Sequence, residues 1–446
     1  MQNNKLEMMR MDKLVLNMSL PMIISLLIQS LYNIVDSIFV AKISEQALTA
    51  TSLAYPLQML MIAVGVGTAV GLNAILSKTL GQGNKEEASQ VAMTGLTLSI
   101  ICALIFAVAG LLFSKKIANS FTDSIDTADL CAQYLWVCMV FCLGNLVCMT
   151  FQRLLQAVGN TLLSMVILVS GAVTNIVLDP ILIFGLCGVP AMGIQGAAWA
   201  TVTGQWVSMI VGFFLNRKYN PDVALSFKGF SFRMMRVRKI YRVGMPTIIM
   251  QSMTSFMVTA FNGILNPISS TAVAFFGVYY KLQSFLFMPI NGLGQAAIPI
   301  VGFNLGAKHK DRILHCAKIT YAASSAIAFL GTMIFLIFGK ALLELFSASG
   351  DMLEIGIPAL RIICISFIPA SFTIITGYIA SGLGEGMTNM VGAFLRQFCP
   401  LIPCAWVLSY VGGINTVWYA FWCSEIVAGL YASVRFRSLV NCQIEV

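Results

Sequence analysis

The sequence predicts an all-α polytopic membrane protein with twelve transmembrane helices arranged as two parallel six-helix repeats around a central cavity. Composition, the spacing of apolar segments and an internal repeat lead to this fold class. Of the 446 residues, 58% are hydrophobic and 10% are charged, whereas soluble domains carry roughly 25% charged residues. The mean hydropathy is +0.85, and only a bilayer can solvate so much apolar surface. A soluble enzyme, a disordered chain and a disulfide scaffold are excluded.

Apolar runs of about 20 residues, separated by charges or by clusters of Gly, Asn and Pro, mark the spans. We expect them at 14–40, 50–77, 90–113, 131–152, 161–185, 193–215, 241–265, 271–303, 314–338, 355–382, 388–410 and 415–434. Span eight is long and contains Pro289, Gly292, Gly294 and Pro299, so we expect it to be kinked or broken.

The distribution of basic residues predicts the orientation of these spans. With the N-terminus inside, most of the 27 Lys and Arg residues fall on cytoplasmic segments, Arg396 among them. The opposite side then holds only Lys42, Lys115, Lys116 and Lys340. Positive charge marks cytoplasmic loops, so we expect a multi-pass protein of the cell membrane with both termini in the cytoplasm. The densest basic run, Arg217 to Arg242, lacks the interleaved aromatic residues of a nucleic-acid site.

The two halves of the chain repeat one another. Pro21 pairs with Pro246, and the same spacing pairs Ser44 with Ser269, Gln58 with Gln283 and Gly159 with Gly384. Each half has six spans, so both halves insert in the same orientation, as in transporters that work by alternating access. We therefore expect a cytoplasmic N-terminus (1–13), a first lobe (14–215), a basic linker (216–240), a second lobe (241–437) and a cytoplasmic tail (438–446).

Signatures of catalysis and of ATP use are missing from the sequence. The stretch from Gly81 to Lys85 lacks the spacing of a phosphate-binding loop. Twelve cysteines form no Cys-x-x-Cys pair, and there are only two histidines, so no metal site is expected. We predict no enzyme activity and no cofactor, and an ion gradient as the energy source.

Two carboxylates in the first half are the main candidates for ion coupling, because charge within a membrane is costly and is often functional. Asp36 and Asp179 fall at similar depth in spans one and five, with Tyr32 and Asn33 on the face of Asp36 and Asn175 one turn before Asp179. Such a cluster can share a proton or coordinate Na⁺. The alternative is that Asp179 only caps a helix broken before Pro180, while Asp36 faces a water-filled crevice.

Other polar residues within spans are candidates for lining the cavity or binding substrate. Lys281 and Arg361 can bind an anionic group or snorkel to an interface. Glu425 can attract a cationic substrate or form a structural pair. The repeat-equivalent Gln58 and Gln283 are expected to line the cavity.

Several stretches resemble the multidrug and toxic compound extrusion (MATE) family, and the resemblance covers nearly the whole chain. They are Pro21, Tyr32 to Val40, Gly81-Gln82-Gly83 and, most specifically, Asn175 to Gly185 with its Asn-x-x-x-Asp-Pro pattern. The likeness is greatest to the DinF-like branch. It implies that Asp36, Asp179, Asn175 and Thr201 form a cation-responsive site and that Pro21 is a hinge in span one.

The chain departs from the family pattern at two places. Ala41-Lys42 replaces the usual glycine after span one. Gln251 and Thr254 stand where the NorM-like branch carries acidic residues, so a second ion site of that type is not expected.

The resemblance implies a secondary active multidrug exporter that exchanges amphipathic, often cationic, organic compounds for H⁺ or Na⁺. The main alternative is a flippase or exporter of lipid-linked oligosaccharide or another specific amphiphile. We expect a monomer whose partners are small-molecule drugs or toxicants and the lipid bilayer. The sequence does not distinguish H⁺ from Na⁺ and does not identify the physiological substrate.

Overall fold

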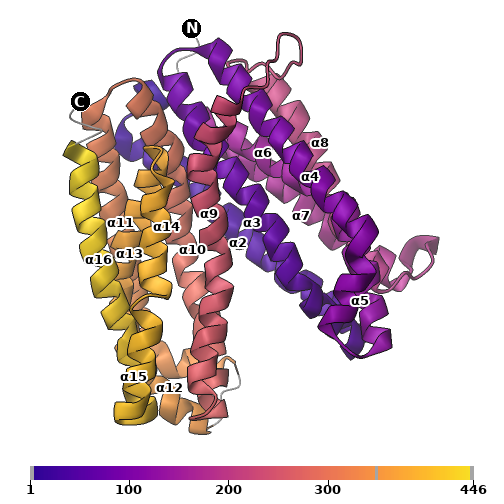
Figure 1. The fold of residues 1–446 in the computed structure, drawn as a ribbon, viewed down its shortest axis with the longest axis vertical. Helices are drawn as coiled ribbons and strands as arrows, with labels where there is room; N and C mark the ends of the chain where they lie inside the picture. Colours follow the sequence, from indigo (N-terminus) through magenta and orange to yellow (C-terminus); the bar gives the residue numbers. More distant parts are fainter. Residues whose placement is uncertain (1–4, 347–349, 442–446) are drawn as a thin grey trace. The chain divides into compact units, whose positions relative to one another are not determined.

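The computed structural model describes residues 5–346 and 350–441, and within these residues it contains helices and no strands (Figure 1). The chain divides into two compact units. The first unit comprises Ile24–Ile248 and the start of the chain as far as Glu7. The second comprises Met8–Ile23 and the chain from Ile249 onward. Helices α2 and α9 each contribute residues to both units.

The helices of the first half follow the six predicted spans, after a short N-terminal helix. They are α1 (Lys5–Met8), α2 (Met11–Ala41), α3 (Glu45–Gly81), α4 (Lys85–Phe121), α5 (Ile125–Val140), α6 (Leu143–Ala157), α7 (Thr161–Phe184) and α8 (Ile194–Tyr219). Those of the second half are α9 (Met234–Leu265), α10 (Ser270–Gly306), α11 (Lys310–Glu344), α12 (Gly350–Ile363), α13 (Phe367–Gly382), α14 (Gly386–Gln397), α15 (Leu401–Gly412) and α16 (Ala420–Leu439).

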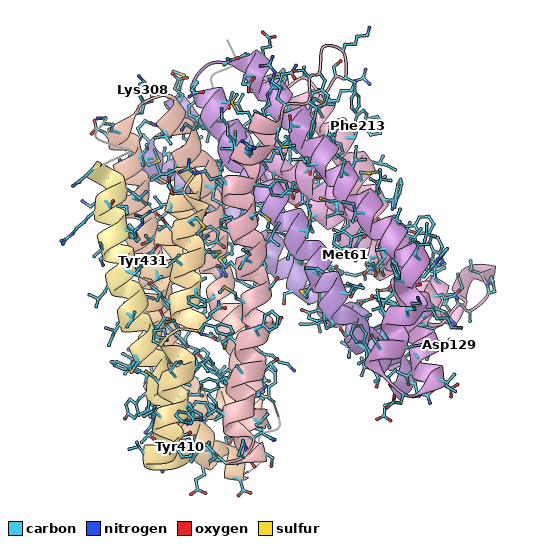
Figure 2. The ribbon with its side chains drawn as sticks, in the orientation of Figure 1. Met61, Asp129, Phe213, Lys308, Tyr410 and Tyr431 are labelled. Atoms are coloured by element: carbon cyan, nitrogen blue, oxygen red, sulfur yellow. The ribbon has the colours of Figure 1, made fainter. Side chains whose placement is uncertain are left out.

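The predicted fold class and number of spans are confirmed. Eleven helical segments of the described chain are long and apolar enough to cross a bilayer, and the bent pair of α5 and α6 makes a twelfth. Large apolar side chains remain exposed along the helices, such as Phe213 on α8, which Figure 2 labels. These side chains are suited to contact lipid.

The internal repeat extends to the backbone conformation. Helices α3 and α10 have equal length and begin after the paired residues Ser44 and Ser269, whose hydroxyl oxygens accept the N–H of Ala47 and Ala272 at 3.0 and 3.3 Å. Gly159 and Gly384 both have positive φ, at 82° and 90°. Because glycine adopts this conformation without strain, the same turn can join α6 to α7 and α13 to α14.

Spans four and ten are broken in the middle at equivalent places, and span eleven is interrupted between α14 and α15. The chain bends by 45° between α5 and α6, where the Trp206 indole donates a hydrogen bond to the carbonyl of Phe141 at 3.1 Å. Between α12 and α13 a short 3₁₀ turn intervenes, and the Trp422 indole bonds the carbonyl of Ile362 at 2.7 Å. Each indole lies on the last span of its own half and satisfies a carbonyl at the break.

Span eight was expected to be kinked or broken, and it is not broken. Helix α10 runs from Ser270 to Gly306 without a break, with Pro289 and Pro299 inside it. A proline inside a helix removes one backbone hydrogen bond but does not by itself end the helix when packing holds both sides. The last third of α10 is almost entirely buried, so tertiary contacts support it there.

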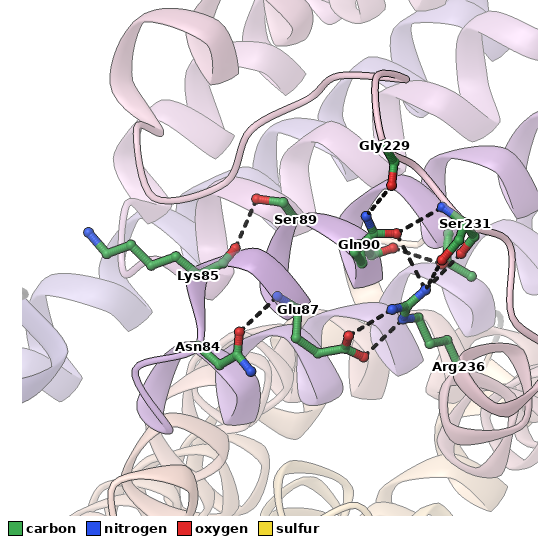
Figure 3. Close-up of polar contacts among 9 residues, drawn as sticks. Asn84, Lys85, Glu87, Ser89, Gln90, Gly229, Ser231 and Arg236 are labelled. Atoms are coloured by element: carbon green, nitrogen blue, oxygen red, sulfur yellow. Dashed lines mark hydrogen bonds and ion pairs between the residues drawn. The ribbon is translucent and has the colours of Figure 1, made fainter.

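The segment between α8 and α9 is held against the start of α4 within the first unit (Figure 3). Arg236 bonds Glu87 through two nitrogens, at 2.9 and 2.7 Å, and donates to the carbonyl of Ser231 at 2.7 Å. Gln90 accepts the N–H of Ser231 and donates to the carbonyl of Gly229. We call these five residues the linker clamp. It fixes the basic segment to one helix end at several points.

Candidate functional site

A cavity of about 570 Å³ lies within the first unit, between α2, α3, α5, α6 and α8. Its wall mixes polar and apolar side chains, and Met61, on its apolar part, is labelled in Figure 2. The polar lining residues are Gln29, Tyr32, Asn33, Asp36, Ser37, Thr51, Ser52, Tyr55, Gln58, Tyr134, Asn145, Thr201 and Gln205.

Helix α2 places three of the sequence-predicted residues on the cavity wall. Tyr32, Asn33 and Asp36 are three and four residues apart, so they share one face of the helix. One carboxylate oxygen of Asp36, Oδ1, is buried and has no hydrogen-bond partner among the described residues.

Asp179 is fully buried on α7 and does not line the cavity. The amide of Asn175 donates to Asp179 Oδ1 at 3.3 Å and to the hydroxyl of Thr201 at 3.3 Å. Thr201 lies on α8 and does line the cavity. A polar chain of three side chains thus leads from the cavity surface to Asp179.

Close packing of α7 on α8 brings this polar chain together. A Cβ atom added to Gly204 would lie 2.6 Å from the carbonyl oxygen of Gly171, and one added to Gly171 would lie 2.1 Å from Ser208 Oγ. No larger residue fits at either glycine without moving the helices apart. The glycines therefore permit the approach at which Asn175 reaches Thr201.

Helix α7 continues through Pro180 to Phe184 and ends at Gly185, which has a φ of 77°. The alternative that Asp179 merely caps a helix broken before Pro180 is therefore wrong. Asp179 is an internal helix residue, and its second oxygen, Oδ2, is buried without a partner in the described chain.

Asp36 and Asp179 are connected through the cavity wall by Thr201 and Asn175. Together with Asn175 Oδ1, they present three buried oxygens that accept no hydrogen bond from any described residue. Buried polar atoms normally have partners, and exceptions commonly reflect a bound water or ion or a functional strain. This oxygen-rich arrangement can accept a proton or ligate a small hard cation.

The cavity wall also includes residues that the sequence analysis did not identify as candidates. The Gln58 amide donates to the hydroxyl of Tyr134 at 3.3 Å, and it contacts Cys138 at 3.7 Å. Tyr134, Asn145 and Gln205 are far from the aspartates in sequence, and only the fold brings them to the same cavity. Their one detectable signal was polarity within an apolar span.

The remaining candidates lie in the second half. Gln283 is half-buried on α10, whereas Lys281 and Arg361 are exposed. None of the three lines the cavity of the first unit. Pro21 lies inside α2, which remains helical on both sides of it.

Glu425 is buried on α16 and pairs with Arg396 on α14, whose Nε lies 2.9 Å from the carboxylate. The placement of Arg396 on a cytoplasmic segment was therefore wrong. Helix α14 begins at Gly386 and carries Arg396 in its last turn, well inside the helical span. The charge of Glu425 offsets the cost of burying this arginine.

The duplicated six-helix architecture, with a polar cavity enclosed by the helices of one half, defines a polytopic membrane transporter. The model of the MatE family matches residues 21–181 and 246–407, which is most of the chain and includes both halves. The chain belongs to the MatE family, the multidrug and toxic compound extrusion family that its sequence resembles.

Curated relatives match over almost the full length. The multidrug export protein MepA of Staphylococcus haemolyticus is 24% identical over 432 residues, which cover 96% of this chain and 94% of the relative. A protein of Shewanella oneidensis named FAD transporter is 24% identical over 421 residues, covering 94% and 92% of the two chains.

A solved structure described as the outward-facing conformation of a multidrug resistance MATE family transporter of the MOP superfamily has the same fold. Its TM-score is 0.90, with 24% identity and 99% of each chain covered. At this level of identity the likeness concerns the fold.

Proposed function

We propose that the protein is a secondary active exporter that exchanges amphipathic, often cationic, organic compounds for H⁺ or Na⁺. The observation that carries the proposal is the cluster of unpartnered oxygens on Asp36, Asn175 and Asp179 beside a mixed polar and apolar cavity. The names of the relatives, multidrug export protein and FAD transporter, support export or transport of organic molecules.

The cavity suits a cationic amphiphile on chemical grounds. Met59 and Met61 supply adaptable apolar surface, and Tyr32, Tyr55 and Tyr134 supply rings that attract a cation. An ionised Asp36 at the wall adds a charge of the opposite sign. A flat aromatic cation would bury its rings against the apolar and aromatic lining, and the ionised Asp36 would balance its charge.

Coupling follows if the ion and the substrate compete for the same carboxylates. Protonation, or Na⁺ binding, neutralises Asp36 and Asp179, which removes the attraction for a cationic substrate and relieves the repulsion between the two charges. We propose that α2 responds to this neutralisation by changing its conformation at Pro21. Such coupling requires only that ion and substrate favour different conformations of the protein.

Gradient-driven efflux from liposomes tests the proposal. Ethidium release by purified protein would be followed with a pH gradient and a sodium gradient imposed separately, for the native chain and for Asp36→Asn. Asp129→Asn is the matched control, because Asp129 is exposed on α5.

We expect one gradient to drive efflux, Asp36→Asn to abolish it and Asp129→Asn to preserve it. Efflux that survives Asp36→Asn would reject the coupling site while retaining the exporter. If folded native protein moved no ethidium under either gradient, a narrower substrate would be favoured. The second candidate function is then export or flipping of a lipid-linked oligosaccharide or another specific amphiphile.

A further inference from the structure

The second half holds a buried ion pair that the proposed coupling site does not use. Arg396 Nε donates to both oxygens of Glu425, at 2.9 and 3.1 Å, and the two side chains are 14% and 7% exposed. The guanidinium lies 5.9 Å from the centre of the Phe287 ring. All three residues belong to the second unit.

The geometry of the pair leaves part of the guanidinium free. Only Nε is engaged, and neither Nη1 nor Nη2 has a hydrogen-bond partner in the part of the chain that the structure describes. Neither amino group is among the fully buried unpartnered atoms, so the partial exposure of the side chain extends to this end. An arginine normally uses its planar fork to bind a carboxylate or phosphate through two nitrogens.

A second unpartnered donor lies in the same cluster. The Tyr279 side chain on α10 is completely buried, and its hydroxyl has no hydrogen-bond partner among the described residues. The Tyr279 ring packs against that of Phe421, one turn before Glu425 on α16, with the ring centres 5.8 Å apart. Leaving a buried donor unbonded costs free energy, so several free donors around one ion pair indicate a site for an acceptor.

The internal repeat relates this ion pair to two residues near the polar site of the first half. The spacing that pairs Pro21 with Pro246 pairs Gly171 with Arg396, and the spacing that pairs Gly193 with Gly413 pairs Gln205 with Glu425. Gln205 lines the cavity of the first unit, and Gly171 packs against α8 one turn before Asn175. At these equivalent positions the first half has a glycine and an amide, and the second half has the guanidinium of Arg396 and the carboxylate of Glu425.

We propose that Arg396, held by Glu425, forms an anion-binding subsite that receives a carboxylate or phosphate group of the transported amphiphile. Glu425 fixes the guanidinium through Nε, and Nη1 and Nη2 donate to the anionic group. The inference rests on the proposed function as an exporter, and it widens the substrate class from cations to zwitterionic and anionic amphiphiles.

Binding to purified protein in detergent tests the subsite separately from transport. The probes are tetramethylrhodamine, which carries a free carboxylate, and its methyl ester, which has the same rings without the anion. Fluorescence polarisation gives both affinities for the native chain and for the double variant Arg396→Gln with Glu425→Gln, which removes the pair without leaving one buried charge.

We expect the native chain to prefer the free acid. The double variant should lose about tenfold or more in affinity for the acid, the equivalent of a charge-assisted hydrogen bond, and should bind the ester as the native chain does. An unchanged preference, or an equal loss for both probes, would overturn the subsite.

Two further variants keep the test informative. Arg396→Lys retains a charge next to Glu425 but lacks the fork, so it should lose the preference for the acid even if the double variant does not fold. Arg437→Gln removes an exposed arginine of the same half, on α16, and should leave the preference intact. If the acid preference were present but no gradient drove transport, the exporter proposal would fail and the subsite would stand.

Discussion

Asp36 and Asp179 have different surroundings. Asp36 reaches the cavity, whereas Asp179 is fully buried and is connected to the cavity by Asn175 and Thr201. Asn175 is the only described side chain that donates a hydrogen bond to Asp179. The amide therefore holds the buried carboxylate in its orientation and links it to α8.

Replacing Asn175 with Ala should damage both stability and coupling. The change removes the donor to Asp179 Oδ1 and the bond to Thr201, so we expect the free energy of unfolding to fall by about 1–3 kcal/mol. Thermal unfolding in detergent measures this loss, and gradient-driven efflux should fall with it.

Ser170→Ala is the control for this prediction. The Ser170 hydroxyl donates to the carbonyl of Ile167 within its own helix and touches no part of the polar chain. A variant Asn175→Ala with unchanged efflux and unchanged unfolding would show that Asp179 needs no orienting donor.

At the residue scale, the sequence predicted which site residues share one helix. It did not predict which residues from distant spans lie at the same cavity. Tyr32, Asn33 and Asp36 follow from helical spacing, and so does the pair of Asn175 and Asp179. Tyr134 and Gln205 belong to distant spans, and no local pattern relates them to Asp36. Arg396 was counted with the cytoplasmic residues although the predicted span at 388–410 includes it, and α14 carries it in its last turn.

At the scale of the elements, the linker clamp holds the segment between α8 and α9 to α4 by several hydrogen bonds. Arg236 is buried and pairs with Glu87 in the first turn of α4, beside the N-cap Asn84 (Figure 3). A carboxylate at a helix N-terminus is also favoured by the helix dipole. The clamp therefore joins the start of α4 to the start of α9 through the two hydrogen bonds between Arg236 and Glu87.

Glu87→Ala should destabilise the first unit and release the segment between α8 and α9. Arg236 would remain buried without its anion, at a cost of about 1–3 kcal/mol after allowing for the partial exposure of Glu87. Tryptic cleavage after Lys228 or Arg233 should become faster, and the unfolding temperature should drop.

Glu86→Ala provides the comparison, because Glu86 is exposed in the same helical turn and has no ion pair in the described chain. Its loss should leave cleavage and unfolding nearly unchanged. Equal effects of the two substitutions would mean that the helix dipole, and not the pair with Arg236, holds the segment.

The predicted spans correspond to observed helices, but the internal breaks were not predicted. Hydropathy locates a span because lipid solvates every apolar side chain alike. The break between α5 and α6 depends on an indole from α8 that bonds the Phe141 carbonyl, which is a tertiary contact. In α10 the reverse holds, since buried packing keeps the helix intact despite two prolines.

At the scale of the whole molecule, the two halves share a repeated backbone but carry different polar side chains. Helices α3 and α10 begin and end at equivalent residues, and Gly193 and Gly413 adopt similar positive φ angles of 54° and 59°. Yet the first half carries Asp36 at the cavity and the buried Asp179, and the second carries the pair of Arg396 and Glu425. The repeat was readable from sequence because turns and caps constrain residue type, whereas side chains inside the lobes are free to diverge.

The central claim is that ion and substrate compete for Asp36 and Asp179, and equilibrium binding tests it most directly. Ethidium affinity of purified protein would be measured across pH at fixed sodium and across sodium at fixed pH and ionic strength. The native chain should bind ethidium more weakly as the coupling ion increases, because the ion neutralises the carboxylates and the linkage is reciprocal. The double variant Asp36→Asn with Asp179→Asn should show no such dependence. An ion dependence that is the same in both proteins would contradict the account.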